Sequence, residues 1–145
     1  DIKALPDDFS GEINPAILFS PSRQPVGMFA AENLAAALAD VAIPVVGLTE
    51  EQLPMLAAGS VVGIWAKLSE APAGSALTLR VTIDGSPSAD AELVIADGGA
   101  LIGLATFNRN DISFTAGQTL GIAVSTEAGW TSTTLDVLAG LMVEM

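Results

Sequence analysis

A two-residue hydrophobic alternation dominates this chain from residue 60 onward and most constrains what it can fold into. Leu77, Leu79, Val81 and Ile83 alternate with polar or charged residues. Because successive side chains of a strand point to opposite faces, this pattern predicts a strand with one buried face. A second such strand is predicted over residues 134–144, where five apolar residues share one face: Leu135, Val137, Ala139, Leu141 and Val143.

Turn sequences break the rest of this region into further short strands. They include Asp84-Gly85 and Asp97-Gly98-Gly99, which are typical of tight turns. Many short strands with turns between them predict an all-β fold, an antiparallel β-sandwich of jelly-roll type. No full helix alternates with the strands, so a parallel α/β sheet is not expected. The remaining strands are expected at residues 60–68, 91–95, 101–107, 112–114 and 119–124.

The prolines mark off the first part of the chain. Of the eight prolines, all but Pro72 and Pro87 lie within residues 1–59. Proline removes a backbone donor and interrupts both helices and central strands. The sequence therefore predicts an N-terminal arm over residues 1–59, followed by a sandwich domain over residues 60–145.

Two short helices are expected within this arm. Residues 29–40 are rich in good helix formers and place Leu34 and Leu38 on one face. The residues Thr49-Glu50-Glu51-Gln52 match a capping box, although Pro54 limits that helix to about one turn. The start of the chain has no basic region ahead of an apolar run, so no signal peptide is expected.

Composition excludes several classes of function. The chain has no cysteine and no histidine, which rules out the Ser-His-Asp and Cys-His arrangements of nucleophilic catalysis. A formal net charge of −12 opposes binding to nucleic acid or to an anionic membrane surface. No apolar run is long enough to span a membrane. We therefore expect a protein that is not an enzyme and needs no cofactor.

The acidic residues allow two weaker hypotheses. The turns at residues 97–99 and 108–111 could offer oxygen ligands to Ca²⁺, but Asp and Asn are ordinary turn residues there, so no metal site is predicted. Paired carboxylates could serve a glycoside hydrolase, which would need two of them facing each other in a cleft. The candidates are Glu50, Glu51, Asp84 and Asp90.

Five apolar residues are candidate contacts for a partner or ligand. Trp65 is predicted on the outward face of its strand, where it would cover the sandwich edge, pack beneath the N-terminal arm or anchor an interface. Trp130 is predicted in a loop, either exposed to stack on a sugar or buried at a contact. The other three belong to the alanine-rich segment: Phe29, Leu34 and Leu38.

Three stretches resemble a module of tailed-bacteriophage virion proteins: residues 63–68, residues 77–85 with their terminal Asp-Gly, and residues 112–124 with Phe-Thr-Ala-Gly before a strand. The resemblance covers about residues 60–145 and extends to tumour-necrosis-factor-like trimers. It implies a virion structural protein, foremost a capsid decoration (cement) protein. Such a protein would be a homotrimer on the outer capsid surface, in contact with the major capsid protein or other virion proteins. The alternatives are a head- or tail-fibre domain and a glycan-binding module for host recognition.

Overall fold

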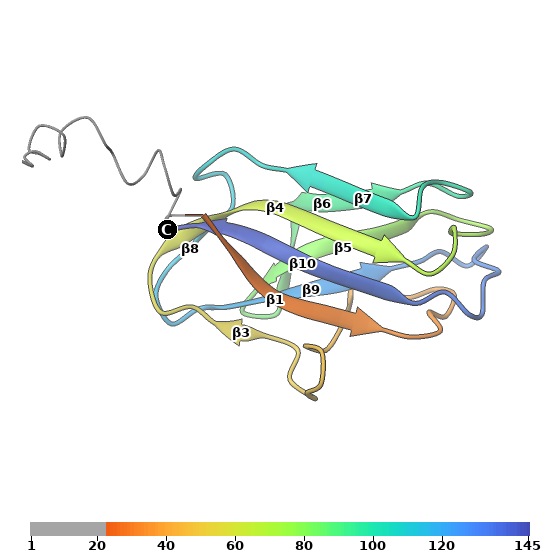
Figure 1. The fold of residues 1–145 in the computed structure, drawn as a ribbon, viewed down its shortest axis with the longest axis horizontal. Helices are drawn as coiled ribbons and strands as arrows, with labels where there is room; N and C mark the ends of the chain where they lie inside the picture. Colours follow the sequence, from red (N-terminus) through yellow and green to blue (C-terminus); the bar gives the residue numbers. More distant parts are fainter. Residues whose placement is uncertain (1–22) are drawn as a thin grey trace, which may run out of the picture.

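The computed structural model describes residues 23–145, which form an all-β fold with ten strands and no helix (Figure 1). The absence of helices also means that no helix in this range could cross a membrane. The strands are β1 (Arg23–Ala31), β2 (Val41–Ala42), β3 (Leu53–Pro54), β4 (Gly59–Leu68), β5 (Leu77–Ile83), β6 (Ser86–Ile95), β7 (Ile102–Thr106), β8 (Ser113–Phe114), β9 (Thr119–Ser125) and β10 (Val137–Glu144).

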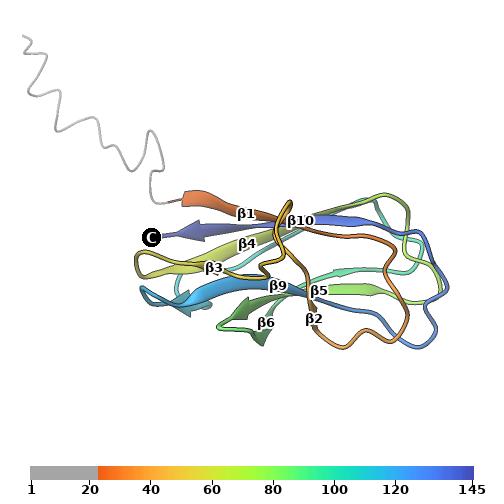
Figure 2. The ribbon, with the colours of Figure 1, turned by 90° about the horizontal axis from the view of Figure 1, so that it is seen from below.

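The strands form two antiparallel sheets that lie face to face (Figure 2). One sheet has the order β1-β10-β4-β7, with β8 also paired to β4, and we call it the β10 sheet. The other has the order β2-β9-β5-β6, with β3 also paired to β9, and we call it the β9 sheet. The predicted antiparallel β-sandwich is therefore confirmed.

The pairing of the strands is nested like a long hairpin that has been rolled up. β5 pairs with β6, β4 with β7, β9 with β2 and β3, and β10 with β1. The tip of this hairpin is the two-residue turn between β5 and β6, where Asp84 and Gly85 have φ angles of 51° and 82°. Positive φ at both positions is the geometry of a type I′ turn, which the predicted Asp-Gly turn favours. Such nested pairing across two sheets is a jelly roll.

The core lies between the sheets and is built from the alternating positions. Leu77, Leu79 and Val81 of β5 are fully buried. Val137, Ala139, Leu141 and Val143 of β10, in the other sheet, are also buried, and all these residues belong to one hydrophobic cluster. The alternation read from the sequence therefore identifies the inward faces of both strands.

The prediction of a helix over residues 29–40 is wrong. Residues 23–31 form β1 instead, and the loop that follows has left-handed backbone at Asn33, Ala37 and Asp40. The backbone N–H groups of Leu34 and Ala37 donate to carbonyl oxygens of residues 135 and 127 at 3.0 and 3.1 Å. These distant carbonyls satisfy the backbone N–H groups that a helix would pair locally. Tertiary contacts therefore override the helix propensity of the alanines.

The helix expected after Thr49 is also wrong. Leu53 and Pro54 form β3 and pair with Leu120 and Thr119 of β9. With β1 in the β10 sheet and β2 and β3 in the β9 sheet, residues 23–59 contribute strands to both layers. The first part of the expected arm, residues 1–22, lies outside the described residues.

Candidate protein interface

The outer face of the β10 sheet carries three cross-strand rows of mainly apolar side chains. Side chains directly opposite each other on paired strands share one face, so the register defines each row. The first row is Ala30–Leu138–Lys67–Ile102, the second is Gly140–Trp65–Leu104, and the third is Pro25–Met142–Gly63–Thr106. We call these residues the apolar face.

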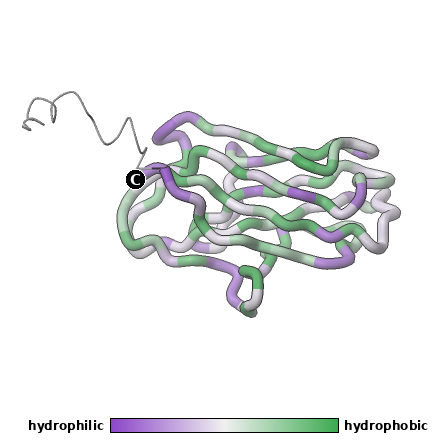
Figure 3. The backbone as a smooth tube through the Cα atoms, viewed as in Figure 1, coloured by the Kyte–Doolittle hydropathy of each residue, from purple (hydrophilic) through white to green (hydrophobic). Residues whose placement is uncertain are grey.

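The apolar face is most exposed along the edge strand β7. Ile102 and Leu104 are 69% and 68% exposed. Figure 3 shows hydrophobic colouring along most of β7, β4 and β10. These exposed apolar residues lie side by side in the register, so the apolar face is the candidate docking surface of the described residues.

The outer face of the β9 sheet has the opposite character. Arg80 of β5 lies between two carboxylates, with its Nη1 atom 2.9 Å from Asp40 Oδ1 and its Nη2 atom 2.9 Å from Glu92 Oε2. The hydrogen bond to Asp40 is the main cause of the raised pKa of Arg80. Thr78 flanks Arg80 on the same strand and is partly exposed, whereas Thr82 on its other side is buried. The exposed part of this face is therefore more polar than the outer face of the β10 sheet, although it includes one exposed valine, Val94.

Trp65 lies in the middle of the apolar face, on the outward side of its strand as the alternation predicts. It lies between Gly140 and Leu104 in the register of the sheet. Its side chain is partly buried because the indole extends over Gly140 of the neighbouring strand. A large ring held in this way is a suitable anchor for a protein contact.

The other four candidate residues lie elsewhere. Phe29, Leu34 and Trp130 are buried within the hydrophobic core, and Leu38 is partly buried against it. The indole Nε1–H of Trp130 donates to the carbonyl oxygen of Leu34 at 3.0 Å. Trp130 is 5% exposed, so its ring is not available to stack on a sugar. All four side chains therefore help to stabilise the fold. The hydrogen bond between Trp130 and Leu34 joins the loop before β10 to the loop after β1.

Sequence reasoning missed four residues of the apolar face: Ile102, Leu104, Leu138 and Met142. A signal was present in residues 101–105, Leu-Ile-Gly-Leu-Ala, where apolar residues occupy both faces of the predicted strand. On β10 the apolar residues likewise extend to the outward positions 138 and 142. Apolar residues on both faces of a strand indicate that both faces are covered.

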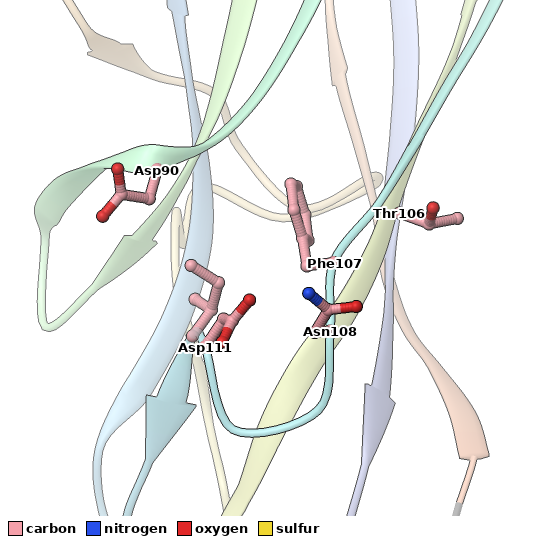
Figure 4. Close-up of a pocket in the computed structure, with 6 residues that line it drawn as sticks. Asp90, Thr106, Phe107, Asn108 and Asp111 are labelled. Atoms are coloured by element: carbon pink, nitrogen blue, oxygen red, sulfur yellow. The ribbon is translucent and has the colours of Figure 1, made fainter.

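A hollow of about 340 Å³ lies where β7 ends, lined by residues of β6 and of the loop after β7 (Figure 4). Asp90 and Asp111 both line it, but the Asp90 carboxylate is directed away from Phe107. The hollow therefore lacks two carboxylates that face each other, as glycoside hydrolysis needs. Among residues 23–145 no group of three or more metal-ligating side chains comes together.

Comparisons with known proteins give likenesses of fold. No family model matches the chain, and no curated protein matches it. The acid-stable capsid structure of Helicobacter pylori bacteriophage KHP30 is similar with a TM-score of 0.47 at 13% identity, over 85% of this chain and 93% of that chain. The capsid asymmetric unit of cyanophage Pam1 is similar with a TM-score of 0.45 at 17% identity, over 85% of this chain and 84% of that one.

The globular domain of the zebrafish complement 1qA protein is a third similar structure. Its TM-score is 0.40 at 12% identity, over 80% of this chain and 95% of that chain. Identities and TM-scores this low assign the chain to no family.

Proposed function

We propose that this chain is a structural protein of a tailed-phage virion that decorates the capsid as a homotrimer and binds other virion proteins. The observation that carries the proposal is the apolar face, centred on Trp65 and Leu104, on an otherwise acidic protein. A face of this composition needs a protein partner to remove it from water. The opposite outer face, with Arg80 between two acids, is suited to solvent.

The sequence resemblance supports the virion assignment. The three stretches that carry it correspond to β4, to β5 with its Asp-Gly turn, and to β8 with β9. These elements belong to both sheets, so the resemblance extends through the sandwich. A net charge of −12 suits an outer capsid surface, because it would repel packaged DNA.

The proposed mechanism is binding without chemistry. A decoration protein stabilises a capsid when its contacts bridge neighbouring capsid subunits and oppose their separation. A standard interface of about 1,600 Å² in total is enough for one specific contact of this kind. The hollow beside Asp90 has no role in the proposal.

The test is co-sedimentation of the purified chain with capsids of its phage that lack it, together with its absolute mass in solution by light scattering. We expect a trimer that binds the capsids. The double variant Ile102→Asp, Leu104→Asp should lose both properties. A monomer that does not sediment with the capsids would contradict the proposal.

Val94→Asp is the matched control. Val94 is 51% exposed and lies on the outer face of the β9 sheet, beside Thr78 in the register. The Val94→Asp substitution places the same kind of new charge at an exposed apolar strand position on the opposite face. This variant should remain a trimer and bind the capsids normally.

A further inference from the structure

The strand β7 forms one edge of the β10 sheet, and hydrogen bonds at both of its ends show which of its residues face β4. The carbonyl oxygen of Leu101 accepts from β4 at 2.7 Å, and the N–H group of Phe107 donates to β4 at 2.9 Å. Backbone groups alternate in direction along an antiparallel strand, so residues 103 and 105 also face β4. The N–H and C=O groups of Ile102, Leu104 and Thr106 therefore point away from the sheet. Within residues 23–145, no strand pairs with this edge.

The other edge strands of the described chain carry features that hinder pairing. β1 has Pro25 and a bulge, and β6 has Pro87, Asp90 and Glu92. β2, β3 and β8 are only two residues long. In contrast, β7 reads Ile-Gly-Leu-Ala-Thr and has neither a proline, a charge nor a bulge. An unprotected apolar edge of this kind is a template on which another strand can pair.

The edge of β7 is complementary to itself. When two copies of β7 are placed antiparallel with Leu104 opposite Leu104, Ile102 of each copy lies opposite Thr106 of the other. In each of these pairs the open groups of both residues point toward the partner, so each pair can exchange two hydrogen bonds. Any other register leaves an outward residue of β7 with no β7 residue opposite it. The self-pairing about Leu104 therefore uses all the open groups of the strand.

The side chains fit the same register. The row Gly140–Trp65–Leu104 of one copy meets the same row of the other copy at the two leucines, so a tryptophan flanks the leucine pair on each side. Lys67 lies beside Ile102, and its row continues into Thr106 and Gly63 of the other copy. No like charges are therefore opposed across the two strands, although the chain as a whole is acidic.

Pairing also enlarges the apolar face. Adjacent strands lie about 4.8 Å apart, so the face of one copy is about 14 Å wide and that of a pair is about 34 Å wide. The rows extend about 14 Å along the strands, at about 3.4 Å per residue. The area therefore rises from about 200 Å² to about 480 Å², nearer the roughly 800 Å² that each partner of a specific interface buries.

We infer that β7 of one copy pairs antiparallel with β7 of a second copy, about a two-fold axis at Leu104. The two β10 sheets then join into one continuous sheet. This inference goes beyond the proposed function, because a two-fold contact differs from the three-fold contact of a homotrimer and links copies of two different trimers.

The first test uses the absence of cysteine, which allows one nitroxide spin label to be attached to the full-length chain. Labels on Leu104→Cys are attached to residues whose Cα atoms lie about 5.5 Å apart in the pair. Labels on Ile102→Cys, the matched control on the same strand and face, are about 14 Å apart. Dipolar coupling falls with the cube of the distance, so coupling at position 104 should be roughly tenfold stronger. Equal coupling at the two positions, or none, would overturn the inference.

The second test changes the edge and leaves its bonds to β4 in place. Thr106→Pro removes an outward N–H group and puts a proline ring at the edge, where a strand tolerates it. Light scattering should give the wild type a mass that is an even multiple of the chain, and Thr106→Pro should halve it. Thr106→Val keeps the donor and the branched shape, and should keep the wild-type mass. A mass that Thr106→Pro leaves unchanged, with circular dichroism showing a folded chain, would contradict the pairing.

The masses also separate this inference from the proposed function. A particle of six chains that Thr106→Pro converts to a trimer supports both. A particle of two chains that it converts to a monomer supports the pairing and makes the homotrimer wrong. A trimer without coupling at position 104 makes the pairing wrong and leaves the homotrimer standing. If the label at position 104 loses mobility only when capsids are added, a strand of another virion protein occupies the edge and the inference is wrong.

Discussion

The indole of Trp65 extends over the backbone of Gly140, its directly opposite partner on β10. A Cβ atom built on Gly140 would lie 2.5 Å from both Cε2 and Nε1 of the ring. The absent side chain at position 140 is therefore what allows the ring to lie close to the sheet. This relationship fixes the position of the largest side chain on the apolar face.

Gly140→Ala should displace the ring. The new methyl group cannot coexist with the indole, and we expect a loss of about 1–3 kcal/mol in the free energy of unfolding. Quenching of tryptophan fluorescence by acrylamide should increase, because Trp65 moves into solvent. Urea unfolding and the quenching constant measure the two effects.

Gly63→Ala is the control for this substitution. Gly63 lies on the same outer face, but its Cβ atom would meet its nearest neighbours at an ordinary 3.5 Å. We expect a change within about 0.5 kcal/mol. Equal effects of the two substitutions would show that the ring does not depend on Gly140.

Trp130→Phe should destabilise the fold because it removes one buried hydrogen bond. The substitution leaves the buried carbonyl of Leu34 without the indole donor, which costs about 1–3 kcal/mol. Urea unfolding, monitored by circular dichroism, measures the loss in the free energy of unfolding. Trp65→Phe, on the surface, should cost clearly less, and the reverse order would contradict the assignment of Trp130 to the core.

Glu70 should contribute to the acid sensitivity of the fold. Hydrogen bonds from the hydroxyls of Ser132 and Thr134, at 2.6 and 2.8 Å, lower the pKa of Glu70 below its ordinary value of 4.5. A lowered folded-state pKa adds stability above the unfolded pKa, and this stability is lost as the pH falls through the folded value. The melting temperature of the wild type should therefore decrease as the pH is lowered below 4.5. Part of that decrease should be absent in Glu70→Gln.

Glu50→Gln, in an exposed loop, is the control for that charge change. It removes the same charge from an exposed position, so a change common to both variants reports the lost charge and not the hydroxyl pair. If Glu70→Gln gives the same curve as Glu50→Gln, the hydroxyl pair does not hold the Glu70 carboxylate.

Gly85→Ala should strain the turn at the tip of the rolled hairpin. Gly85 has a φ of +82°, a conformation that costs a residue with a Cβ atom about 1–2 kcal/mol. Gly85→Asn should cost less, because asparagine tolerates left-handed backbone. Thermal melts of the two variants give the order, and equal losses would show that backbone conformation is not the cause.

The sequence was sufficient to predict the position and the inward face of strands in which one face is apolar and the other polar. β5 occupies residues 77–83, where the alternation predicts a strand, and the inward residues of β10 are those predicted to share a face. In both strands a buried face defines the register, because a slip of one residue would expose the whole apolar set. The outward position of Trp65 follows from the same rule.

The sequence was insufficient where partners far along the chain decide the local structure. The segment around Leu34 has helix propensity, but its hydrogen bonds go to residues about 90 to 100 positions away. The burial of Trp130 depends on that same loop, so no local pattern could reveal it. The apolar face was missed because an outward apolar residue on one strand becomes a surface only when the neighbouring strands are known.

The central place of β10 has a consequence for how the protein is made. β10 lies between β1 and β4, although those two strands are synthesised long before it. Until residues 137–144 have left the ribosome, β1 has no neighbour in its sheet and the inward side of β4 faces an unfinished core. The sandwich therefore closes only after almost all of the described chain has emerged, and nascent chains need protection from one another until then.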